Sequence, residues 1–122
     1  MIQRIEGLPE GVLGFSAKGT VTKLDYEQVI TPAVEEALSK YEKVRFLYCL
    51  GDDFTDFAPA AMWEDAKIGL GHLVSWERVA VVTDVEWISA AVKAFGFLFH
   101  GHARVFRNDE STEARAWISE GL

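Results

Sequence analysis

Three things are scarce in this chain: cysteine, positive charge and long apolar runs. Cys49 is the single cysteine among 122 residues, which excludes an internal disulfide and favours a reducing compartment, the cytoplasm. Twelve basic residues against 19 acidic ones leave a net charge of -7, which argues against nucleic-acid binding and against docking on anionic lipid. No apolar run approaches the roughly 20 residues that cross a bilayer, so we expect no integral membrane segment.

The short motifs of common catalytic sites are also missing. No glycine-rich phosphate loop opens a helix, because Gly69-Leu70-Gly71 follows an expected helix. Neither GxSxG nor HExxH occurs. The sequence therefore predicts no catalytic residue, no cofactor and no metal site, and an enzyme that uses loop carboxylates is only a third hypothesis.

What the chain does contain is the mixture of an ordinary globular protein, with 49% hydrophobic and 25% charged residues. We predict a single domain over residues 1–122. Its central strand is the apolar run 44–50, which stops at Gly51 before an acidic loop and before Pro59 at the start of a helix. Binding sites of open α/β sheets usually lie where such a strand ends.

The remaining elements alternate along the chain. We expect strands at 2–6, 12–18, 44–50, 78–82 and 103–106, and helices at 24–41, 59–71, 84–95 and 113–120. The short turn 8–11 makes an antiparallel hairpin of the first two strands. Pro32 predicts a kink or two abutting helical pieces, and Thr83 with Glu86 matches a capping box. The fold class is α/β, with a five-stranded mixed sheet and four helices.

Three passages carry a resemblance to a known family. They are Leu24-Asp25-Tyr26-Glu27 with Ile30-Thr31-Pro32-Ala33, then Met62-Trp63-Glu64-Asp65, and then residues 77–87. With the terminal segment 106–118, they resemble the SpoIIAA-like family of small bacterial proteins, whose fold is STAS-type. The resemblance implies a non-catalytic binding or regulatory module that acts through protein partners and forms a homodimer. CRAL-TRIO-like domains have a similar sheet and imply the alternative, a carrier or sensor of a small apolar or lipid-like ligand.

The acidic loop is the first candidate site. In the related anti-sigma-factor antagonists, a phosphorylated serine follows an aspartate at the start of the second helix. Asp56 matches that aspartate, but Phe57 stands in place of the serine, and Thr55 is the nearest hydroxyl. We take Asp52, Asp53, Thr55, Asp56 and Phe57 as partner or ligand contacts. The three carboxylates could hold magnesium, but a solvated loop with one helix cap is the simpler interpretation.

A second candidate set is aromatic. Its members are Trp63, Trp87, Phe95, Phe97 and Phe99. They could line a pocket or form a subunit contact, although packing in the core is the simpler interpretation. His100 and His102 lie two residues apart and could begin a metal site with His72, but the spacing supplies no evident third ligand.

Overall fold

The computed structural model describes residues 1–71, 75–96 and 101–122. A central sheet has the strand order β1-β2-β4-β6-β7. Its strands are β1 (Ile2–Arg4), β2 (Val12–Ala17), β4 (Val44–Leu50), β6 (Trp76–Thr83) and β7 (His102–Phe106). Strand β1 runs antiparallel to β2, and each later neighbour is parallel. The predicted five-stranded mixed sheet and N-terminal hairpin are therefore confirmed.

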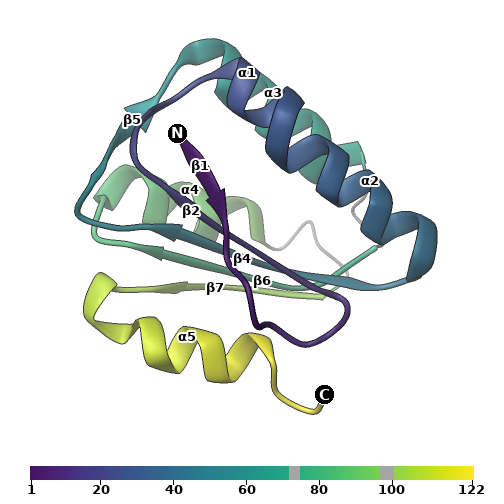
Figure 1. Cartoon of the computed structure of the whole chain (residues 1–122). Helices are drawn as coiled ribbons and strands as arrows, with labels where there is room; N and C mark the ends of the chain where they lie inside the picture. Colours follow the sequence, from purple (N-terminus) through teal and green to yellow (C-terminus); the bar gives the residue numbers. More distant parts are fainter. Residues whose placement is uncertain (72–74, 97–100) are drawn as a thin grey trace.

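Helices cover both faces of this sheet (Figure 1). One face carries a continuous helical segment, α1 (Lys23–Asp25), the π-helix η1 (Tyr26–Ile30) and α2 (Thr31–Lys40), together with α3 (Pro59–Gly71) and α4 (Glu86–Phe95). The other face carries α5 (Ser111–Ile118), which follows the short 3-10 turn η3 (Asn108–Glu110). Among the described residues, no helix is both long enough and apolar enough to cross a membrane.

The first helical segment changes its hydrogen-bond pattern just before Pro32. The backbone N–H of Thr31 bonds to the carbonyl of Tyr26, five residues earlier, and Pro32 is the second residue of α2. Proline has no N–H to continue an ordinary α-helical ladder, and a widened π turn just before it accommodates the missing donor. The two abutting pieces are confirmed, and the wide turn begins at Tyr26, which is fully buried.

Two local expectations differ from the structure. Residues Phe54–Phe57 form strand β5, which pairs in parallel with β3 (Gly19–Val21) as a second, two-stranded sheet, so part of the expected acidic loop is a strand. The capping box is wrong, because Val85 is the N-cap of α4, and Thr83 Oγ1 instead accepts a hydrogen bond from the Val85 N–H at 3.0 Å.

Each face of the central sheet has its own apolar core. The core beneath α2, α3 and α4 is rich in aromatic rings, and the Phe46 ring lies 5.4 to 5.7 Å from those of Phe15, Tyr48 and Trp76. The core beneath α5 is smaller and contains Leu47, Val82, Phe106 and Ile118. The smaller core leaves room at one edge of its face for charged side chains.

Candidate functional site

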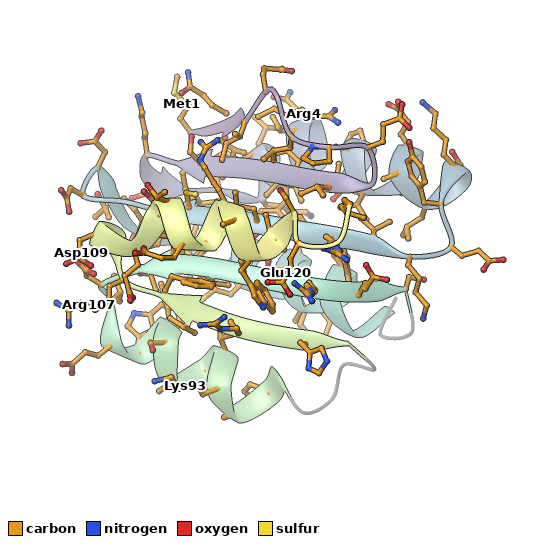
Figure 2. All side chains as sticks on the ribbon, turned by 90° about the horizontal axis from the view of Figure 1, so that it is seen from below. Met1, Arg4, Lys93, Arg107, Asp109 and Glu120 are labelled. Atoms are coloured by element: carbon orange, nitrogen blue, oxygen red, sulfur yellow. The ribbon has the colours of Figure 1, made fainter. Side chains whose placement is uncertain are left out.

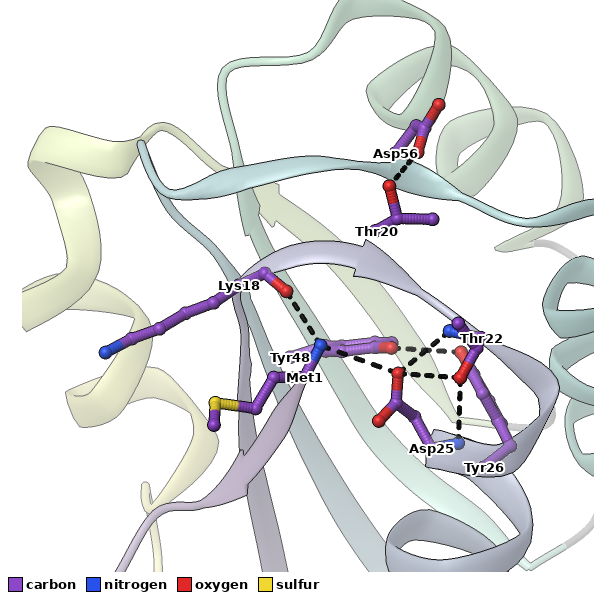
Figure 3. Close-up of polar contacts among 8 residues, drawn as sticks. All are labelled: Met1, Lys18, Thr20, Thr22, Asp25, Tyr26, Tyr48 and Asp56. Carbon is purple, nitrogen blue, oxygen red and sulfur yellow. Dashed lines mark hydrogen bonds and ion pairs between the residues drawn. The ribbon is translucent and has the colours of Figure 1, made fainter.

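The predicted acidic segment is exposed and well anchored. Asp52 and Asp53 lie in the turn after β4, and the next two predicted residues, Thr55 and Asp56, are exposed on β5. Figure 3 shows Thr20 Oγ1 of β3 donating to Asp56 Oδ1 at 3.0 Å. Pairing with β3 in the two-stranded sheet and this hydrogen bond therefore anchor the segment.

The ends of three parallel strands are also tied together here. The Asn108 side-chain amide donates to Asp52 Oδ1 at 3.3 Å, and its backbone N–H donates to Asp84 Oδ1 at 2.9 Å. These residues follow β7, β4 and β6, respectively. Across residues 1–71, 75–96 and 101–122, no group of three or more His, Cys, Asp or Glu side chains could hold a metal ion. These contacts, with the Thr20–Asp56 hydrogen bond, make Asp52, Asp56 and Asp84 anchors of their loops.

The described members of the aromatic set lie at the surface. Trp63 is 66% exposed, Trp87 50% and Phe95 63%. The core-packing interpretation therefore fails for these three residues. Their exposure favours a contact surface over the lining of an internal cavity, and the carrier hypothesis stays a prediction. Phe97, Phe99 and His100 lie outside the described residues, as does His72.

Both tryptophans of this set lie near the start of α3. The Phe57 ring, two residues before Pro59, makes an edge contact with Trp87 at a centroid distance of 6.5 Å. Trp63 follows Pro59 by about one helical turn, and its neighbour Met62 is 46% exposed. We call Phe57, Met62, Trp63 and Trp87 the α3 surface.

A partly buried chain of hydrogen-bonded side chains reaches Asp65 of α3, and it was not identified from the sequence. Tyr26 Oη donates to Asp65 Oδ1 at 2.7 Å and lies 3.0 Å from Tyr48 Oη. Both phenols are buried, and Figure 3 shows their hydroxyls approaching each other. Tyr26 has one proton, so when Asp65 is ionised Tyr26 donates to Asp65 and Tyr48 donates to Tyr26. This chain connects η1, β4 and α3.

The surroundings of Tyr26, Tyr48 and Asp65 favour the neutral form of each side chain. Burial, followed by the nearby Asp65 charge, raises the pKa of Tyr26, and burial also raises the pKa of Tyr48. The residue Asp65 keeps exposed surface, but protein atoms crowd its carboxyl group. This burial raises the pKa of Asp65, and the Tyr26 hydrogen bond offsets it only in part. Neutral phenols serve as fixed hydrogen-bond partners and make poor proton acceptors.

The neighbouring Asp25 behaves oppositely. Burial alone would raise its pKa, but hydrogen bonds from the backbone N–H and hydroxyl of Thr22, at 2.8 and 3.1 Å, lower the pKa below its usual value. Thr22 and Asp25 form a reciprocal capping box at the start of α1, and the Met1 ammonium lies 3.5 Å from Asp25 Oδ2 (Figure 3). Asp25 is therefore a helix-capping residue.

Comparisons with known proteins agree with this architecture. A solved structure of an uncharacterized protein of the DUF3478 family with a SpoIIAA-like fold, from Shewanella loihica PV-4, is similar with a TM-score of 0.76 and 27% identity. The match covers 97% of this chain and 92% of that chain. None of the curated proteins matches. The SpoIIAA-like family model matches residues 12–119, and the chain therefore belongs to the SpoIIAA-like family.

Proposed function

We propose that this protein is a non-catalytic module that binds another protein through the α3 surface. The observation that carries the proposal is the exposure of Trp63, at 66%, beside Met62, at 46%. Tryptophan and methionine are enriched in protein–protein interfaces, and tryptophan often contributes most of the binding energy. Membership of the SpoIIAA-like family supports a binding role over a catalytic one.

The rim of the α3 surface indicates the chemistry of the partner. Asp52, Asp53 and Asp56 are exposed on the segment that leads into α3. Interfaces commonly have an apolar centre and a polar rim, and complementary charge speeds association. We therefore expect the partner to present an apolar patch edged by lysine or arginine.

A homodimer is also part of the proposal, through a different surface, because two copies of the acidic rim around the α3 surface would repel each other. The proposal also places the protein in a reducing compartment such as the cytoplasm. The described residues contain Cys49 as a free thiol, and burial raises the pKa of this thiol, which disfavours the reactive thiolate. Cys49 is thus suited to packing beneath α5.

Site-specific photo-crosslinking tests the proposal. A photo-reactive amino acid in place of Trp63 should give a discrete crosslinked product in the host cell. The same group in place of Glu35, exposed on α2, should give none. Sedimentation velocity of the purified protein then shows whether this chain forms a dimer on its own. Equal crosslinking at both positions, or none at position 63, would overturn the proposal.

A further inference from the structure

A surface hollow of about 610 Å³ lies at the β7 edge of the central sheet, at the end away from β1. Three cationic or imidazole side chains and one indole line it, together with two glycines and an alanine: Arg78, His102, Arg104, Trp117, Gly96, Gly101 and Ala103. Its volume falls in the range of small-molecule sites, roughly 300–1,000 Å³. The lining is basic although the chain has a net charge of -7, so the hollow concentrates positive charge where the whole molecule does not.

Strand register explains why these groups share one face. Arg78 on β6 pairs with His102 on β7, and Ala80 pairs with Arg104 two residues further along. Side chains two residues apart on a strand point to the same face. In Figure 2, which views the molecule from the side of α5, this helix lies over the middle of the sheet and leaves β7 uncovered beside it. His102 and Arg104 are accordingly exposed.

The arginines on this face have different roles. Arg45, which is buried, donates to the carbonyl oxygens of Ile118 and Glu120 and pairs with Glu77. Arg78 donates to the Trp117 carbonyl and pairs with exposed Glu120 at 3.4 Å. Both therefore satisfy the C-terminal end of α5, where positive charge is favoured.

Arg104 has no such role. Its guanidinium carbon lies 4.6 Å from the centroid of the Phe106 ring and 5.3 Å from that of Trp117. Among the described residues, no acidic side chain pairs with Arg104. Stacking uses the faces of a guanidinium and leaves its N–H edges free, and these edges match the paired oxygens of phosphate or carboxylate. The rings of Phe106 and Trp117 thus hold the Arg104 guanidinium in place and leave its N–H groups available for a ligand.

We propose that this hollow binds a small molecule through an oxyanion, phosphate or carboxylate, held by the N–H edge of Arg104. His102 would add a ring N–H donor from the same face. Arg78 contributes positive charge, because its guanidinium carbon lies 5.0 Å from the centroid of the same Trp117 ring. Binding at this position also places the ligand against the indole, which gives a spectroscopic signal.

Titration of the full chain with inorganic phosphate and with citrate tests the proposal. Amide and indole NMR signals should shift saturably at His102, Arg104 and Trp117, beyond the change produced by sodium chloride at equal ionic strength. Phosphate shifts without citrate shifts would assign the ligand to the phosphate class, and the reverse result to carboxylates.

Two variants with the same charge change make the test specific. Arg104→Gln should weaken binding by at least about tenfold, the loss expected for a charge-assisted bidentate contact. Arg107→Gln is the matched control, because Arg107 follows the same strand, is exposed and does not line the hollow. Its affinity should stay within about twofold. Equal weakening in both variants, or shifts that only track ionic strength, would show general electrostatics and overturn the proposal.

Discussion

At the scale of single residues, the Tyr26–Tyr48–Asp65 chain is the feature that sequence reasoning was least able to find. Tyr26 fits the apolar stripe of its helix, and Tyr48 fits the apolar run of β4. Asp65 lies outside the apolar stripe of α3, so the sequence pattern predicts that its side chain faces solvent. The contact joins positions 39 residues apart, so neither local periodicity nor composition could reveal it.

Replacing Tyr26 tests whether this chain stabilises the fold. Tyr26→Phe keeps the ring but removes the hydroxyl that contacts both Tyr48 and Asp65. We expect the free energy of unfolding to fall by about 1–3 kcal/mol, because the buried Tyr48 hydroxyl loses its partner. Urea denaturation measures the change. Tyr26→Phe combined with Tyr48→Phe should cost less than the sum of the single changes, and strict additivity would contradict the coupling.

At the scale of elements, the strands of the central sheet were predictable and the small second sheet was not. Strand β4 is a seven-residue, largely apolar run, and such a run indicates a strand that is buried on both faces of the sheet. Strand β3 has three residues and β5 has four, too few for a period to emerge. Similarly, the exposed tryptophans were identified by residue type, but their position at the surface depends on how α3 and α4 pack.

Arg45 fixes helix α5 to the sheet, and its replacement tests this element. Arg45→Met keeps most of the apolar stem and leaves the carbonyls of Ile118 and Glu120 without their donor. We expect a loss of about 2–4 kcal/mol in the free energy of unfolding, with faster hydrogen exchange in α5. Arg115→Gln, exposed on the same helix, should change stability by less than about 0.5 kcal/mol. Unchanged exchange in Arg45→Met would show that Ala114 and Ile118 hold the helix unaided.

At the scale of the whole molecule, stability depends on pH through groups whose pKa differs between the folded and unfolded chain. Asp65 and Asp25 act in opposite directions. Folding raises the pKa of Asp65, so the folded state binds its proton more tightly than the unfolded state. Folding lowers the pKa of Asp25, so its contribution is present above the unfolded pKa and is lost as the pH falls.

The raised pKa of Asp65 and the lowered pKa of Asp25 predict opposite changes in the free energy of unfolding with pH when each aspartate is replaced by asparagine. In the wild type, the contribution of Asp65 to the free energy of unfolding declines as the pH rises from 3.8, the ordinary pKa of an aspartate, to the raised pKa of the folded protein. Asp65→Asn keeps an acceptor for Tyr26 and avoids this decline, so it should gain stability relative to wild type across that interval. Asp25→Asn should lose stability relative to wild type as the pH rises from its lowered pKa to 3.8. Urea titrations between roughly pH 2 and pH 8 measure both differences. A pH-independent difference for Asp65→Asn would mean that its carboxyl group is hydrated in the folded protein.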